Sequence, residues 1–154
     1  MARRVADVRA RIDAVAAGRH VELLAVTKGF GSDAVIAAGA AGCSAIGENY
    51  AQELLVKRAA AAAAGVAVHF IGRLQSNKVR DLADAVDVWE SVDRPRVVSE
   101  LARRVHGARV LVQVDATGEA GKGGCRPEDV ADLVVSAGHA GLVVEGLMTV
   151  GPLG

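Results

Sequence analysis

Short runs of branched, apolar residues alternate with helix-favouring segments along this chain, and this alternation constrains its fold more than any other feature. The expected strands comprise residues 22–28, 43–47, 66–72, 86–92, 109–115 and 142–150. The expected helices comprise residues 3–17, 32–41, the alanine-rich segment that Gly65 ends, a helix beginning near Ser76, one from Pro95 to the break at Gly107, and residues 127–137. Alternation of strand and helix predicts a parallel sheet with right-handed crossovers.

Two architectures satisfy this alternation: an open doubly wound sheet and a closed barrel of strand–helix units. No strand is followed by Gly-x-Gly-x-x-Gly, which disfavours dinucleotide binding. A barrel needs eight strand–helix units, so about six units correspond to a barrel without its last quarter. No change in composition marks a boundary, and we therefore expect a single, partial barrel domain over residues 1–154.

The charge balance and the cysteines limit the function classes. Eighteen basic and eighteen acidic residues cancel, which disfavours nucleic acid as a partner. Cys43 and Cys125 form no disulfide framework or zinc motif, so we expect a cytoplasmic protein without a metal site. No signal peptide and no run of apolar residues of membrane-spanning length is present, which predicts no membrane association.

The first expected strand ends in Lys28, followed by Gly29. An unpaired ammonium group is costly in the middle of a buried strand, but at the strand's last residue it projects toward the cleft where parallel strands end. A partly desolvated amine at such a place reacts as a nucleophile with aldehydes. Lys28 is therefore either a Schiff-base lysine or a lysine that opens a solvated loop.

Further polar residues follow the other expected strands, and the carboxyl ends of parallel strands converge on one face. These residues are Glu48, Asn49, His69, Ser91, Asp93, Asp115, Met148 and Thr149. Any parallel sheet carries such a polar rim, and His69, between Val68 and Phe70, also fits a core histidine. The loop Gly118–Gly124 lacks the spacing of a phosphate-binding Walker A loop. We expect a flexible rim loop there and Trp89 in the core.

Several blocks of the sequence resemble one family, in the same order along the chain. They are Ala25-Val26-Thr27-Lys28, Gly47-Glu48-Asn49-Tyr50-Ala51-Gln52-Glu53, His69-Phe70-Ile71-Gly72-Arg73-Leu74-Gln75-Ser76-Asn77-Lys78, Ser91-Val92-Asp93, Val112-Gln113-Val114 with Lys122-Gly123-Gly124, and Gly146-Leu147-Met148-Thr149. The chain resembles the pyridoxal-phosphate homeostasis proteins, a family similar to the N-terminal barrel domain of alanine racemase.

This resemblance implies an α/β fold, a parallel (β/α) barrel of the alanine racemase N-terminal type. It implies one pyridoxal 5'-phosphate, held as a Schiff base on Lys28. Asn49, Ser91 and Met148 match positions that line the cofactor, and His69 and Leu74 do so less directly. Family members are thought to buffer the cofactor or to deliver it, here to pyridoxal-phosphate-dependent apo-enzymes, without an established catalytic turnover. The oligomeric state stays open.

The resemblance also has a point of departure, because family members continue past Gly-Leu-Met-Thr with two more strand–helix units that hold the cofactor phosphate. We therefore expect a C-terminally truncated chain, which is a gene fragment, a split or frameshifted product, or a short protein that pairs with another copy. We expect its binding of the cofactor to be weak and exchangeable. Two alternative functions stay open. One is an amino-acid racemase, with His69, Tyr50 or Asp115 as second base. The other is a remnant that no longer holds the cofactor.

Overall fold

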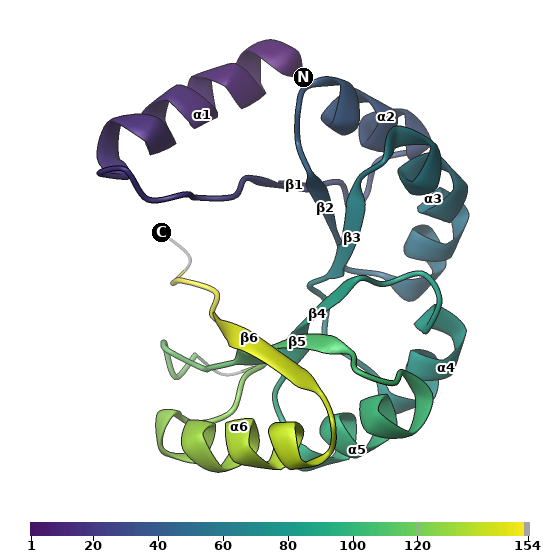
Figure 1. Cartoon of the computed structure of the whole chain (residues 1–154), viewed down its shortest axis with the longest axis vertical. Coiled ribbons are helices and arrows are strands. Elements are labelled where there is room, and N and C mark those ends of the chain that lie inside the picture. The colour runs from purple at the N-terminus through teal and green to yellow at the C-terminus, as the bar shows by residue number, and fades with distance from the viewer. Residues whose placement is uncertain (120, 153–154) are drawn as a thin grey trace. The chain divides into compact units, whose positions relative to one another are not determined.

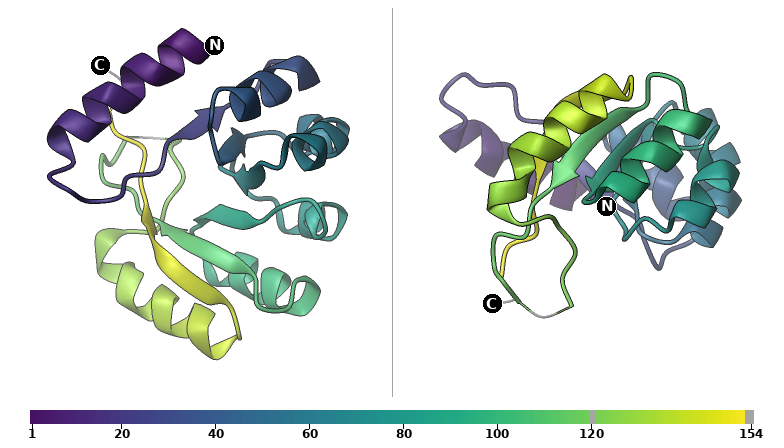
Figure 2. Two further views of the ribbon diagram at one scale, coloured as in Figure 1. Left: turned by 45° about the horizontal axis from the view of Figure 1, so that its top comes forward. Right: turned by 90° about the horizontal axis from the view of Figure 1, so that it is seen from below.

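The computed structural model describes residues 1–119 and 121–152, and the chain divides into two compact units, Met1–His69 and Phe70–Gly154. In both of them strands alternate with helices, and helices cover a face of the strands (Figures 1 and 2). Every predicted strand is present, and each is shorter than expected, because the strand hydrogen bonds stop short of the expected ends.

The first unit contains α1 (Ala2–Val15), β1 (Leu24–Val26), α2 (Ser32–Ala40), β2 (Ala45–Glu48), α3 (Ala51–Ala64) and β3 (Ala67–Phe70), whose last residue belongs to the second unit. The strands follow chain order, β1-β2-β3. β1 and β2 are parallel, with Val26 paired to Gly47. All four residues of β2 are buried, as expected for the central strand of the three.

Two glycines allow the helices of the first unit to pack and to end. Gly39 lies where α2 meets the end of α3, and a Cβ there would lie 3.1 Å from the Cβ of Ala64. The close approach of the two helices therefore favours glycine. Gly65 ends α3 in the left-handed conformation, at φ +63°, as its place in the sequence predicted.

α1 forms where it was predicted, but its apolar stripe is not buried. None of its residues is buried, and Val8 and Val15 are 39% and 74% exposed. The periodicity of the segment therefore predicted the helix correctly, but the apolar side of that helix is not buried.

The second unit contains η1 (Ser76–Lys78), α4 (Val79–Leu82), β4 (Val88–Val92), α5 (Pro95–Arg104), β5 (Arg109–Gln113), η2 (Pro127–Asp129), α6 (Val130–His139) and β6 (Val143–Met148). β4, β5 and β6 are parallel and follow chain order. α4, α5 and α6 lie along one face of these strands (Figures 1 and 2).

The core of the second unit is apolar and centres on Trp89, which is completely buried, as predicted. The ring of Phe70 lies 6.2 Å from that of Trp89 at an interplanar angle of 53°, a tilted arrangement that aromatic pairs favour. Leu82 from α4 and Leu101 from α5 are equally buried. Pro95 is the first residue of α5, where its missing N–H leaves no bond unmade.

Ser32, Ser76 and Asn77 have side chains that commonly cap helices, and the sequence predicts caps at these two helix starts; both predictions are wrong. Ser32 is the first residue of α2, not its cap; Gly31 occupies that position and no side chain caps the helix. Ser76 and Asn77 form the 3-10 turn η1 before α4, where the N–H of Lys78 donates to the carbonyl of Gln75 at 2.9 Å. In both places backbone bonds take the role that the sequence assigned to a side chain.

Candidate functional site

Lys28 lies in a tight turn directly after β1. The N–H of Thr27 donates to the carbonyl of Gly47 on β2, and that of Phe30 donates back to the carbonyl of Thr27, at 3.1 and 3.2 Å. Gly29 has φ +76°, whereas Lys28 has an ordinary negative φ. A positive φ at only the third position is the mark of a type II turn, which requires glycine there. The motif Thr-Lys-Gly therefore encodes a turn that presents Lys28 at its tip.

The side chain of Lys28 is exposed, and its ammonium group makes no hydrogen bond or ion pair with the residues that the structure describes. The sequence predicted a partly desolvated amine at the last residue of the strand. Both parts of this prediction are wrong: the amine is exposed, and β1 ends at Val26. The residue that is buried beyond the strand is Thr27.

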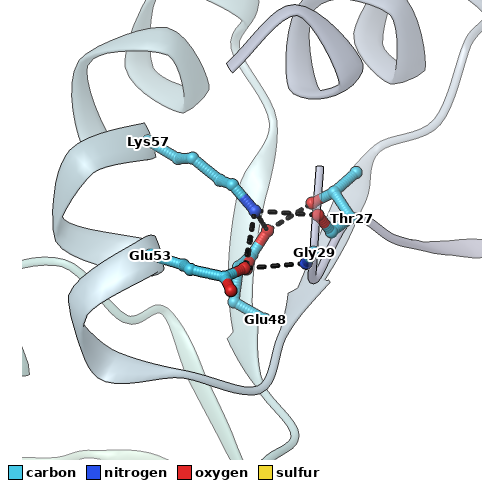
Figure 3. A network of polar contacts seen from close by, with 5 residues as sticks. All are labelled: Thr27, Gly29, Glu48, Glu53 and Lys57. Atoms are coloured by element: carbon cyan, nitrogen blue, oxygen red, sulfur yellow. Dashed lines mark hydrogen bonds and ion pairs between the residues drawn. The ribbon is translucent and has the colours of Figure 1, made fainter. Parts of the chain in front are cut away.

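A network of polar groups, buried at Thr27, Glu48 and Lys57, contacts the backbone of this turn (Figure 3). It comprises Thr27, Gly29, Glu48, Glu53 and Lys57, here called the Lys57 network. Nζ of Lys57 donates to the carbonyl oxygen of Thr27 at 2.8 Å and to both carboxylate oxygens of Glu48 at 2.8 and 3.0 Å. The hydroxyl of Thr27 also donates to Glu48, at 2.5 Å. Glu48 is 0% and Lys57 3% exposed, so this ion pair is removed from water.

Glu53 connects the network to the other side of the turn. Its Oε2 accepts a hydrogen bond from the N–H of Gly29 at 2.7 Å and lies 3.3 Å from Nζ of Lys57. The bond from Gly29, together with the neighbouring Lys57 ammonium, lowers the pKa of the Glu53 carboxyl below its ordinary value. A hydrogen bond from a backbone N–H to an ionised carboxylate is stronger than one to a neutral acceptor.

The spacing of residues on α3 explains this arrangement. Leu54, Lys57 and Ala61 are the buried residues of the helix and recur at three- and four-residue steps, so Lys57 lies on the packed face. Glu53 lies four residues before Lys57, on the adjoining turn. All three protons of the ammonium find an acceptor group: one carbonyl and two carboxylates. Complete satisfaction of this kind is what makes a buried charge tolerable.

Sequence reasoning missed this network. Glu48 was predicted as a member of the polar rim, but it is fully buried and paired with Lys57. Lys57 and Glu53 were assigned only to a helix. The signal that could have found them is a lysine in register with buried apolar residues of the helix, with a glutamate four residues earlier.

The other predicted site residues of the first unit lie near the ends of its strands. Asn49 is half-buried and lies two residues beyond Gly47, as Lys28 lies two residues beyond Val26, its partner in the sheet register. The parallel register therefore brings Lys28 and Asn49 to neighbouring strand ends. His69 lies in β3 and is half-buried, while Val68 and Phe70 on either side of it are buried.

The predicted site residues of the second unit are Leu74, Ser91 and Met148. Leu74 is buried, and its carbonyl accepts a hydrogen bond from Nη2 of Arg94 at 2.7 Å. Ser91 is buried on β4, and its hydroxyl donates to the carbonyl of Gly72. Met148 is the last residue of β6, half-buried, and pairs in register with Gln113.

The glycine-rich loop after β5, expected to be flexible, is held by several hydrogen bonds at its described residues. The carboxylate of Asp115 accepts from the N–H of Gly118 and of Thr117, at 2.9 and 3.1 Å, and these bonds lower its pKa. Nζ of Lys122 donates to the carbonyl of Gly151 at 2.8 Å. Residue 120 lies outside the described part.

No group of three or more His, Cys, Asp or Glu side chains able to hold a metal ion occurs among residues 1–119 and 121–152. Over the same residues, no helix has the length and apolar character needed to cross a membrane.

Comparison with known proteins gives consistent matches. The family model for the N-terminal domain of alanine racemase matches residues 4–153. A pyridoxal phosphate homeostasis protein of Pseudomonas aeruginosa is 41% identical over 97% of this chain and 70% of that protein. One from Schizosaccharomyces pombe is 35% identical over 95% of this chain and 64% of that protein. The structure of PipY from Synechococcus elongatus PCC7942 with PLP bound has a TM-score of 0.79 and 28% identity, covering 99% of this chain and 71% of PipY.

These matches confirm the predicted fold class, a parallel (β/α) barrel of the alanine racemase N-terminal type, with six strand–helix units in this chain. They also establish that the chain spans about two thirds of the length of these relatives.

Proposed function

Because this chain belongs to the pyridoxal phosphate homeostasis protein family, within the alanine racemase N-terminal domain family, we propose that it binds pyridoxal 5'-phosphate on Lys28 and serves the homeostasis of that cofactor. In this proposal the cofactor is held through a Schiff base between its aldehyde and the amine of Lys28. The role is that of a carrier, without catalytic turnover.

The observation that carries this proposal is the contrast between Lys28 and the other lysines. The chain has four: Lys28, Lys57, Lys78 and Lys122. Lys57 is buried and fully engaged, Lys122 is bonded to Gly151 and Glu119, and Lys78 is half-buried at the end of η1. Lys28 is exposed, unengaged among the described residues, and presented at the carboxyl end of a parallel strand, where α/β proteins bind ligands.

The chemistry of the residues fits an aldehyde ligand. The cofactor supplies an aldehyde carbon; the amine of Lys28 attacks it, a C=N bond forms and one water molecule leaves. Asn49 follows the neighbouring strand, so that a polar amide and the amine come from neighbouring strand ends. From the family resemblance we assign Asn49, Ser91 and Met148 to the lining of the cofactor, with His69 and Leu74 in a less direct role.

The partners follow from the carrier role. A protein that holds the cofactor reversibly exchanges it with pyridoxal-phosphate-dependent apo-enzymes, and we place this exchange in the cytoplasm. Release of the cofactor to such an apo-enzyme, followed by the gain of that enzyme's activity, tests this part of the proposal.

Binding at Lys28 is tested with the purified chain and the cofactor. We expect absorbance near the edge of the visible range, and, after borohydride reduction, a covalent adduct that peptide mass mapping places on Lys28. Lys28→Ala removes both signals. Lys78→Ala is the matched control and retains them. An adduct that persists in Lys28→Ala, or that maps to another lysine, overturns the assignment.

A racemase is the second candidate function, and its three candidate bases differ in their surroundings. Asp115 is a poor base, because its carboxylate already accepts three hydrogen bonds and its pKa is lowered. His69 is half-buried in β3. Tyr50 is 55% exposed and follows Asn49, which favours it over the other two. Long incubation with L-alanine and the cofactor decides the question: formation of D-alanine supports a racemase, and its absence supports the carrier.

A further inference from the structure

We propose that the Lys57 network is a positioning device for Lys28, with Glu53 as the residue that fixes the far side of its turn. This inference rests on the function proposed for Lys28 and names residues of this chain that the function requires. None of these residues touches the cofactor in the proposal. They act through the backbone of the turn.

The geometry supports this inference because the network holds the backbone on both sides of Lys28. On the side of β1, Lys57 binds the carbonyl of Thr27, and Glu48 accepts the hydroxyl of the same residue. On the side of α2, Glu53 accepts the N–H of Gly29. Lys28, whose side chain is exposed, therefore lies in the sequence between two backbone groups that the network holds, those of Thr27 and Gly29 (Figure 3 shows both bonds).

The burial of the Glu48–Lys57 ion pair also supports a positioning role. Burial of an ion pair contributes little net stability compared with apolar residues of the same size, so the pair is poorly explained by stability alone. Such a pair can instead specify one arrangement of its neighbours. Here the neighbours are the peptide groups beside Lys28, and α3 supplies both Lys57 and Glu53 from one rigid helix.

Orientation of the amine matters for the reaction itself. A reacting group displaced by about 1 Å can lose roughly a hundredfold in rate, because the approach to the aldehyde carbon is no longer aligned. Order in the turn therefore sets the rate at which Lys28 captures the cofactor. The amine itself stays exposed and able to react whether or not the turn is ordered.

The test compares Glu53→Ala with Glu53→Gln and Gln52→Ala. Glu53→Ala removes the acceptor for Gly29. Glu53→Gln places an amide oxygen at the same position of the side chain, which can still accept the N–H of Gly29, so it is the conservative variant. Gln52→Ala makes the same truncation one residue away, on the exposed side of the helix. Thermal unfolding monitored by circular dichroism establishes that all three variants are folded.

Two measurements report on position. The first is the rate of borohydride-trapped adduct formation on Lys28, which we expect to fall roughly ten- to a hundredfold in Glu53→Ala and to be largely retained in Glu53→Gln and Gln52→Ala. The second needs no cofactor: amide hydrogen exchange of residues 28–30 should accelerate in Glu53→Ala and remain unchanged in β4, β5 and β6.

The outcomes separate this inference from the proposed function. Glu53→Ala indistinguishable from Gln52→Ala in both measurements overturns the positioning role, even if Lys28 carries the adduct. Faster exchange of residues 28–30 without any loss in adduct rate overturns it as well. If the wild-type chain forms no adduct on Lys28, the proposed function fails, and the exchange measurement still shows whether Glu53 orders the turn.

Discussion

The two units of this chain share one architecture but place their charged residues differently. The first unit buries the Glu48–Lys57 ion pair under the turn that carries Lys28. In the second unit, ion pairs such as Glu100–Arg103 and Arg126–Asp129 lie at the surface, and the core around Trp89 is apolar. Under the positioning role proposed above, the buried charges of the first unit order the turn of Lys28, whereas the second unit carries its ion pairs at the surface.

The largest expected effect comes from breaking the buried pair. Lys57→Met leaves the carboxylate of Glu48 buried without its cation and should lower the free energy of unfolding by about 3–5 kcal/mol. Urea unfolding measures this loss. The double variant Glu48→Gln/Lys57→Met removes both charges and should recover much of it. Equal losses in the single and the double variant would contradict the view that the unpaired charge is the cause.

The apolar core of the second unit should respond to truncation instead. Leu101→Ala removes a completely buried side chain from α5 and should lower the free energy of unfolding by about 2–5 kcal/mol. The exposed Val135, on α6, provides the control Val135→Ala, which should change it little. Leu101→Ala should also leave amide exchange of residues 28–30 unaltered, and faster exchange there would break the contrast between the units.

The loop after β5 gives an intermediate effect. Gly124 has φ +130°, and a Cβ there would lie 2.4 Å from the backbone nitrogen of Asp115. Gly124→Ala should therefore cost about 1–3 kcal/mol through strain and overlap. Gly118→Ala, at φ +66° with no atom within 4 Å of the added Cβ, should cost less. Equal losses in the two variants would exclude the overlap as the cause.

Acid should affect the turn of Lys28 through Glu53. The pKa of Glu53 is lowered in the folded state, first by the N–H of Gly29 and then by Lys57. Its contribution to stability is thus fully present above the ordinary pKa of about 4.3 and is lost as the pH falls through the lowered value. Tm measured against pH should show a shallower acid limb in Glu53→Gln than in the wild type. Identical limbs would contradict this assignment.

The smallest effect is expected at the surface of the second unit. The Arg126 side chain is 71% exposed and binds Asp129, whose pKa it lowers. Water and salt screen such a pair, so Arg126→Ala should change Tm by no more than the scatter of replicate melts. A loss comparable to that of Lys57→Met would show that surface and buried pairs do not differ here.

Much of the fold could be predicted from local patterns. The expected strands and helices occur where runs of branched residues, helix-type periodicity and breakers such as Gly65 placed them, because these signals act over a few residues. Errors concentrated at the ends of elements. Ser32 and Ser76 suit a cap, but whether a cap forms depends on which backbone groups already have partners.

The sequence by itself also determined that a lysine closely follows the first strand, because the apolar run stops before Thr27-Lys28-Gly29 and the glycine favours a turn there. Only the tertiary structure decided what lies beneath that lysine. Lys57 meets Thr27 and Glu48, and Glu53 meets Gly29, only when α3 packs against β1 and β2. These partners are up to thirty residues apart in the chain. Local patterns extend over a few residues, so the sequence of α3 can indicate a lysine on the packed face with a glutamate four residues before it, but it cannot indicate their partners Thr27, Gly29 and Glu48.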